Sequence, residues 1–303
     1  MYKSQKHLVS RILFLAFLNM PELACFAQDS TLIGAARNDN QGLVSELLSS
    51  GADPNVRQGD GATALHWAAH RNSEEVVQFL LDAGADVNVS NELGATPLWL
   101  AASNGSGPIV GKLLAVGASP NVRLKMGETP LMSASRAGSA RTVSLLLNAG
   151  ADVNAVEEER GQTALMWAVA QSHSLVTELL LNHGADFNIR SRVWYQLENT
   201  AGNTNPSGNF KMAHGGSSAM MFAARAGDIE TTKVLLEAGA DLNDTAASGV
   251  NALTQAAHSG HEELAIYLLE RGADPNAMTA GYSPLHAAVL RGKKALVREL
   301  LDH

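Results

Sequence analysis

The chain repeats a five-residue phrase, Gly-Ala-Asp-x-Asn, along almost its whole length. The phrase begins at Gly51, Gly84, Gly150, Gly184, Gly239 and Gly272, and a variant with Ser in place of Asp begins at Gly117. Successive starts lie 33, 33, 33, 34, 55 and 33 residues apart. A fixed period of this kind predicts an array of one small unit. We therefore expect the 303 residues to form one solenoid rather than two domains, with a long exposed surface instead of a buried catalytic pocket.

A second motif, four residues long, starts 21 residues before each of these glycines except Gly51, where the first repeat lacks it, and before residue 304, where the next glycine is due. It begins with Thr, Ser or Asn, the residue types that cap a helix by accepting a bond from a free backbone amide. Proline follows in several copies, and it suits the first turn because its missing N–H has no partner there. The copies span Thr63–His66, Thr96–Trp99, Thr129–Met132, Thr163–Met166, Ser218–Met221, Asn251–Thr254 and Ser283–His286. Each copy predicts the start of a first helix, which continues through small residues such as Ala68 and Ala69.

A turn and a second helix are predicted after each first helix. Nine residues after each cap stands a residue suited to positive φ, with Ser172 as the exception. These residues are Asn72, Gly105, Gly138, Gly227, Gly260 and Gly292. Apolar residues then recur at i, i+1, i+4 and i+5, as in Val76, Val77, Leu80 and Leu81, which places them on one helical face. The glycine of the phrase is expected to end this helix, and the Asp and Asn to build the turn that leaves it.

This unit of helix, turn, helix and loop resembles the ankyrin repeat over roughly residues 29–303. The resemblance implies an all-α solenoid of stacked helix-turn-helix units with β-hairpin or loop fingers. It implies eight repeats, at residues 28–59, 60–92, 93–125, 126–159, 160–189, 217–247, 248–279 and 280–303, with a finger insertion at 190–216. The fingers and first helices would then line a concave surface that binds a protein partner.

The first 27 residues do not follow the period and are typical of a secretory signal peptide. Lys3, Lys6 and Arg11 form a basic start before an apolar run at residues 12–18, and small residues precede a cut between Ala27 and Gln28. We expect a bacterial-type exported protein, periplasmic or extracellular. A lipid anchor on Cys25 is the alternative, and it is disfavoured by Glu22, which stands where an apolar residue is expected. Membrane association is expected only through an uncleaved or lipidated N-terminus.

Charge and residue types argue against several kinds of ligand. Removal of residues 1–27 would change the net charge from −8 to −10, and nonspecific phosphate binding needs clustered Lys and Arg, so no nucleic acid is expected. Cys25 is the only cysteine, which excludes a disulfide framework. The ten histidines show no zinc-ligand spacing, so neither a metal nor a cofactor is expected. For His66 and His286 the resemblance implies hydrogen bonds within and between repeats.

The 55-residue interval after Gly184 contains an insertion of about 22 residues. Residues 190–216 combine aromatic and cationic side chains, the types enriched in interface hot spots. The candidate partner-binding residues here are Arg190, Arg192, Trp194, Tyr195, Phe210 and Lys211. Two alternatives stay open: Trp194 and Tyr195 seal the gap between the fifth and sixth repeats, or residues 199–209 form a disordered tether.

Three consecutive carboxylates, Glu157, Glu158 and Glu159, lie at a predicted finger tip. The simpler interpretation is solvated surface, and the functional one is attraction of a basic partner. Hydrolysis by paired carboxylates needs groups opposed across a cleft, which three consecutive residues do not supply. Trp67, Trp99 and Trp167 are expected to pack between repeats.

The function expected from these patterns is a non-enzymatic scaffold that binds a protein through the concave face and the fingers. The alternative is the N-terminal regulatory or targeting region of a longer enzyme or membrane-bound protein. The alternative rests on the period, because the next phrase would begin at residue 304, directly after His303.

Overall fold

The computed structural model describes residues 31–199, 209–278 and 282–303, and these residues form sixteen helices and one two-stranded sheet. The helices alternate between a first and a second helix of each pair. The first helices are α3 (Leu32–Arg37), α5 (Ala64–Arg71), α7 (Pro97–Ser103), α9 (Pro130–Ala137), α11 (Ala164–Ala170), α13 (Ala219–Ala226), α15 (Ala252–Ser259) and α17 (Pro284–Leu290). The second helices are α4 (Gln41–Ser49), α6 (Glu74–Asp82), α8 (Gly107–Ala115), α10 (Ala140–Asn148), α12 (Ser174–Asn182), α14 (Ile229–Glu237), α16 (Glu262–Glu270) and α18 (Lys294–Asp302). The predicted signal peptide, with Ala27 and Gln28, lies outside the described residues.

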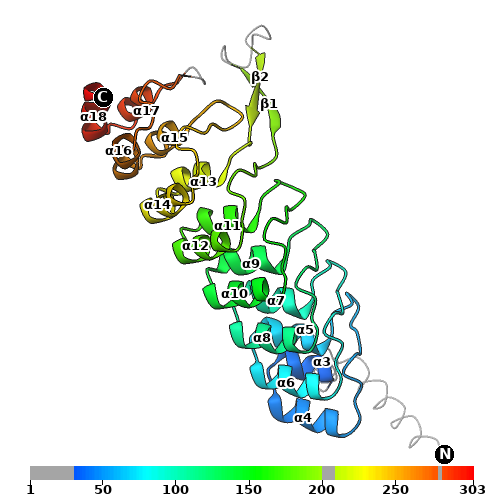
Figure 1. Cartoon of the computed structure of the whole chain (residues 1–303). Coiled ribbons are helices and arrows are strands. Elements are labelled where there is room, and N and C mark those ends of the chain that lie inside the picture. Colours follow the sequence, from blue (N-terminus) through cyan, green and yellow to red (C-terminus); the bar gives the residue numbers. More distant parts are fainter. Residues whose placement is uncertain (1–30, 200–208, 279–281) are drawn as a thin grey trace, which may run out of the picture.

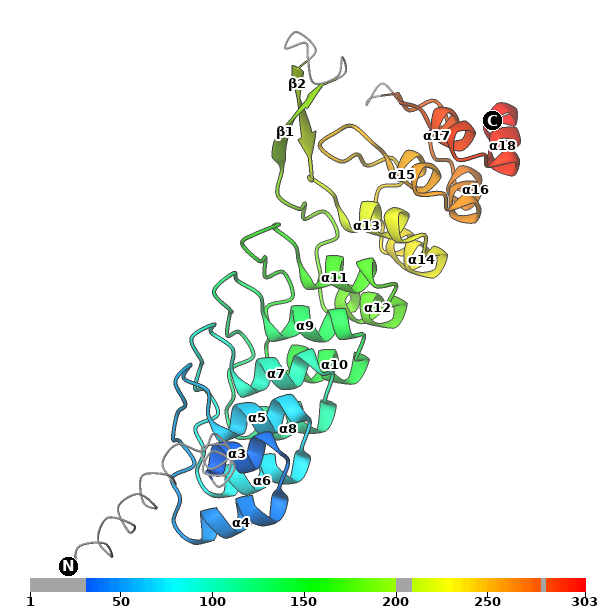
Figure 2. The ribbon, with the colours of Figure 1, turned by 180° about the vertical axis from the view of Figure 1, so that it is seen from behind.

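The pairs stack into one elongated array (Figure 1). Second helices lie along one side, first helices lie next to them, and the loops that join successive pairs project on the opposite side. The view from behind shows the same order (Figure 2). Each first helix contacts the next first helix, and the second helices contact one another from α4 through to α14 and again between α16 and α18. The predicted all-α solenoid with hairpin and loop fingers is confirmed.

A continuous apolar core runs through the array from Leu32 to Leu300. The small residues of the first helices, such as Ala68 and Ala69, are fully buried, which lets neighbouring helices approach closely. Large side chains such as Leu65 are fully buried in the same core. Burial of apolar surface between neighbouring units is what stabilises a stack of this kind.

The turns inside the pairs adopt the predicted left-handed conformation. Gly138 has φ 74°, and Asn72, which also tolerates this region, has φ 59°. Ser172 has φ 58°, so the turn keeps its geometry even where the sequence departs from Gly or Asn. A residue with a Cβ is strained at such an angle.

The Asn of the recurring phrase joins neighbouring repeats, in addition to shaping a turn. The Asn88 amide donates to the Gly117 carbonyl at 3.0 Å, and its oxygen accepts the Ser119 amide at 2.9 Å. Asn55, Asn121 and Asn154 make the same pair of bonds to the following repeat. The Asp of the phrase holds this Asn in place, because the Asp86 carboxylate accepts the Asn88 backbone amide at 2.9 Å. The Asn188 side chain makes no such bond within the described residues.

Backbone hydrogen bonds also connect each finger to the one before it. The donors and acceptors are Glu92 to Asp60, Lys125 to Leu93, Glu158 to Met126, Arg192 to Arg160 and Ala247 to Gly215. In an ordinary finger, one residue donates its amide to the preceding finger and another accepts from the following finger. These two residues lie one position apart, as with Glu92 and Leu93, or two positions apart, as with Glu158 and Arg160. In the fifth finger they are Arg192 and Gly215. The insertion therefore occupies residues 193–214.

The insertion forms an antiparallel hairpin of β1 (Trp194–Asn199) and β2 (Asn209–His214). Its register runs from the Trp194–His214 pair to the Asn199–Asn209 pair. Residues 200–208, the inner part of the predicted tether, lie outside the described residues, whereas residues 199 and 209 are strand residues. The hairpin projects beyond the neighbouring loops (Figure 1). In the described part of the chain, no helix is long and apolar enough to cross a membrane.

Candidate partner-binding groove

Two adjoining hollows lie between the fingers and the first helices in the middle of the array. The first measures about 400 Å³ and is built by α9, α11, the fingers that precede each of these two helices, and Phe222 of α13. The second measures about 480 Å³ and lies between that finger, the hairpin and α13. Both are lined by Glu159, Arg160, Gln162 and Phe222, which form their common wall. We call the two hollows together the inner groove.

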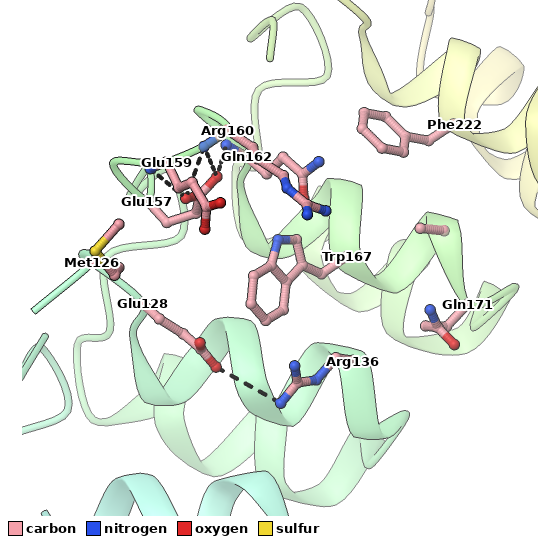
Figure 3. A pocket seen from close by; sticks show the side chains of 11 residues that line it. Met126, Glu128, Arg136, Glu157, Glu159, Arg160, Gln162, Trp167, Gln171 and Phe222 are labelled. Carbon is pink, nitrogen blue, oxygen red and sulfur yellow. Dashed lines mark hydrogen bonds and ion pairs between the residues drawn. The ribbon is translucent and has the colours of Figure 1, made fainter. Parts of the chain in front are cut away.

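Trp167 of α11 lies at the centre of the first hollow. Figure 3 shows it between Arg136 on the preceding first helix, α9, and Arg160 and Gln162 on the finger. The Arg136 guanidinium carbon lies 5.0 Å from the Trp167 ring centroid, a cation–π geometry. The indole N–H is buried and has no hydrogen-bond partner among the described residues. An unmade bond at a buried donor is unfavourable, and an acceptor atom brought by a ligand would satisfy this N–H.

Glu157 shapes the finger and is not free to contact a partner. Only 6% of its surface is exposed. Its carboxylate accepts the backbone amides of Glu159 at 2.7 Å, Arg160 at 2.9 Å and Gln162 at 2.9 Å. The prediction of a solvated run is therefore wrong for Glu157, whereas Glu158 and Glu159 are exposed.

The second finger contains a parallel to Glu157 at the 33-residue period. Asn91 stands 66 residues earlier, and its side chain accepts the amides of Leu93 and Ala95 in the same way. In these two fingers a polar side chain therefore holds the turn that follows it. In the fourth finger this turn presents Glu159 and Arg160 to the inner groove.

The hairpin supplies one wall of the second hollow. The rings of Trp194 and His214 stack with centroids 4.4 Å apart, and both residues line the hollow. Trp194 is 51% exposed and Tyr195 is 69% exposed. The alternative that these two aromatics seal the gap between the fifth and sixth repeats is therefore wrong, because neither is buried.

The other predicted residues of the insertion occupy different places. Arg190 forms an ion pair with Asp244 and donates to the carbonyls of Gly216 at 2.9 Å and Thr245 at 2.7 Å. It thus fixes the base of the hairpin to the next finger rather than facing a partner. Arg192 lines the second hollow.

Tyr195 and Lys211 lie on the ribbon face opposite Trp194, because successive strand residues alternate between faces. Phe210 lies in β2 in register with Glu198. Of the predicted residues of the insertion, the structure therefore brings Arg192 and Trp194 into the inner groove. It adds Trp167 and Phe222 to them, and neither of these was predicted to bind a partner.

Three arginines from separate elements also line the second hollow. Arg160 comes from the finger, Arg192 from the start of the hairpin and Arg225 from the end of α13. Within the described part of the chain, none of the three forms an ion pair. The Arg225 guanidinium lies 5.6 Å from the Phe222 centroid. The hollow is therefore locally cationic on a chain whose net charge is −8.

Sequence reasoning missed Arg136, Arg160 and Arg225, although one signal was present. Aromatic residues recur four positions after the cap at Trp67, Trp167 and Phe222. Each of these rings lies beside an arginine from the last turn of a first helix: Arg37, Arg136 and Arg225, respectively.

The histidine of the second repeat has a structural role. His66 Nδ1 accepts the Thr63 amide at 3.1 Å, and Nε2 donates to the Ala95 carbonyl of the next repeat at 3.0 Å. This arrangement needs the neutral ring, and burial lowers the pKa of His66. Within the described residues, no three His, Cys, Asp or Glu side chains gather as a metal site would require.

Comparison with known proteins agrees with this geometry. The family model for ankyrin repeats (three copies) matches residues 32–123, 99–191 and 195–279, and the model for a single ankyrin repeat matches residues 280–303. A search of the curated proteins found no match. With nearly all described residues covered by these models, the chain belongs to the ankyrin-repeat family.

Proposed function

We propose that this chain is a non-enzymatic scaffold that binds another protein through the concave face and the finger loops, with the inner groove and the hairpin as its main contact. Ankyrin repeats are generally protein–protein interaction modules and are typically non-catalytic. The observation that carries the proposal is the gathering of unpaired arginines and accessible aromatics at one place on the array. Arginine and aromatic side chains dominate the binding energy of protein interfaces.

The proposal includes a count of eight repeats, one for each helix pair, and a location outside the cytoplasm. Residues 1–27 support export because they combine a basic start, an apolar run and a small-residue site before Gln28. Intact-mass analysis of the protein from its native source tests this. A mature chain that begins at Gln28 supports export, and a retained Lys3 segment contradicts it.

Deletion of the hairpin tests its role in binding. Residues 193–214 can be removed by joining Arg192 directly to Gly215, because these two residues carry the backbone bonds to the adjacent fingers. The product has a finger of ordinary connectivity, so the helical content is expected to be unchanged by circular dichroism. We expect the shortened protein to lose its partner in affinity capture from the native compartment.

A control for this deletion changes a different finger. Leu93→Ser alters an exposed apolar residue at the tip of another finger, and we expect it to retain the partner. Equal capture by the intact and shortened proteins would exclude the hairpin from the contact.

The second candidate, a regulatory region of a longer protein, is favoured by the outer face of the last pair. Val289, Leu290 and Leu301 are exposed there. His286 Nδ1 accepts the Ser283 amide at 3.2 Å, the arrangement that in His66 turns Nε2 toward the next repeat. This face suits a further repeat, and reading the coding sequence past residue 303 tests the candidate directly.

A further inference from the structure

We infer that the inner groove binds an extended peptide segment in which a carboxylate side chain lies beside an aromatic or large apolar one. The inference rests on the proposed scaffold function and gives the chemistry of the partner. It is carried by two observations: three arginines without ion pairs line the second hollow, and Trp167 offers an unpartnered indole N–H in the first.

The second hollow is suited to a carboxylate. Arg160, Arg192 and Arg225 reach it from three different elements, so their positions are fixed independently by the finger, the hairpin base and α13. The Arg192 backbone is held to the preceding finger by a 2.7 Å bond to the Arg160 carbonyl, which keeps the first two arginines together. A guanidinium binds a carboxylate through two parallel hydrogen bonds, and three adjacent cations repel one another until an anion arrives.

The first hollow is suited to an aromatic or large apolar side chain. Trp167, Met126 and Phe222 offer apolar surface, and Arg136 already lies over the indole ring. The buried indole N–H can donate to a backbone carbonyl of the same segment. A peptide segment that fills both hollows must cross the common wall, which includes Arg160 and Phe222. Its acidic and apolar side chains are therefore close neighbours in the sequence of the peptide.

The charges on the rim argue against a polyphosphate chain such as RNA. Glu159 lines both hollows, and Glu128 lines the first, where it accepts the Ser133 hydroxyl at 2.6 Å. A polyanion would meet these carboxylates and the field of a chain with net charge −8. A single carboxylate that enters between the three arginines avoids the glutamates of the rim.

The experiment selects binders to the full-length mature protein from a display library of random linear peptides. We expect enriched sequences to pair Asp or Glu with Phe, Tyr, Trp or Leu. The best peptide is then synthesised with a dye, and its affinity is measured by fluorescence anisotropy against the variants Arg160→Gln, Arg192→Gln and Arg225→Gln. Loss of one charge-assisted contact is expected to weaken binding about tenfold or more. Arg141→Gln, on the exposed side of α10, removes the same charge elsewhere and is expected to change affinity less than about twofold.

Several results would overturn the inference. They are enrichment of Lys or Arg, no enriched motif, binding of free glutamate as tightly as of the peptide, or tighter binding of oligo-uridine than of the peptide. Failure of the inference differs from failure of the scaffold function. If the three arginine variants capture the native partner normally while the hairpin deletion does not, the scaffold stands and the acidic ligand is wrong. If neither change affects capture, the acidic ligand and the hairpin contact are both wrong. If the intact protein captures no partner, the scaffold function itself is wrong.

Discussion

Replacing Asn88 by Ala tests whether the recurring phrase holds neighbouring repeats together. The substitution removes two inter-repeat hydrogen bonds, to the Gly117 carbonyl and from the Ser119 amide. Each bond contributes about 0.5–1.5 kcal/mol net, so the two together give about 1–3 kcal/mol. Asn88 is exposed, and the freed groups can bind water, which places the expected loss nearer to 1 kcal/mol.

Asn188 provides a matched control in the same phrase of another repeat. It is exposed, and its backbone amide donates to Asp186 as that of Asn88 does to Asp86, yet its side chain makes no inter-repeat bond in the described ranges. We expect Asn188→Ala to change the free energy of unfolding by less than about 0.5 kcal/mol.

Two measurements distinguish these variants. Urea denaturation gives the loss of stability, and amide hydrogen exchange at Ser119 reports the interface locally, which is useful because a repeat array need not unfold as one unit. Asn88→Ala should lower the protection of the Ser119 amide. Equal effects of the two substitutions, or none at Ser119, would refute the inter-repeat role.

Three further predictions concern single residues. Ser172→Gly should stabilise the protein by about 0.5–1 kcal/mol in thermal melts, because the Ser172 backbone has φ 58°, and Ser172→Ala should not. Since burial lowers the pKa of His66 below 6.5, the neutral ring stabilises the fold fully above pH 6.5, and this contribution is lost as the pH falls toward the lower folded value. In urea titrations at pH 7.5 and 5.5, the free energy of unfolding should therefore change less with pH in His66→Gln than in the unsubstituted protein. The difference is at most about 1.4 kcal/mol per pH unit, and an equal pH dependence would contradict this role of His66. Arg190→Ala should raise amide exchange at Gly216 and cost about 1 kcal/mol, because the guanidinium is half exposed; unchanged exchange would show that other contacts hold the hairpin base.

Much of the fold could be predicted because its signals are local. A cap such as Thr63, an alanine pair and a left-handed turn residue each act within one helical pair, and their repetition at 33 residues determines the stack. The turn at Ser172 shows that the stack imposes this geometry even on a residue that disfavours it. The insertion was located by the same period, although its strands were not assigned.

The candidate groove was harder to predict because its residues are distant in sequence. Arg136, Arg160, Arg192 and Arg225 come from different units, and only the stacking of the fingers brings the last three to one hollow. The burial of Glu157 depends on the path of its own finger, which composition does not reveal. The sequence could not distinguish the roles of Arg190 and Arg192. The structure does so, because Arg190 forms an ion pair with the next finger, whereas Arg192 lines the second hollow.

Site-specific photo-cross-linking tests most directly the claim that the inner groove receives the partner. A photoreactive residue would replace Gln171, which lines the first hollow, and in a separate protein Glu178, which is exposed on α12 in the other helical layer. We expect position 171 to cross-link the partner in the native compartment, at a segment with an acidic residue beside an aromatic or large apolar one, and we expect no cross-link from position 178. Cross-linking from position 178 without cross-linking from position 171 would contradict binding in the inner groove.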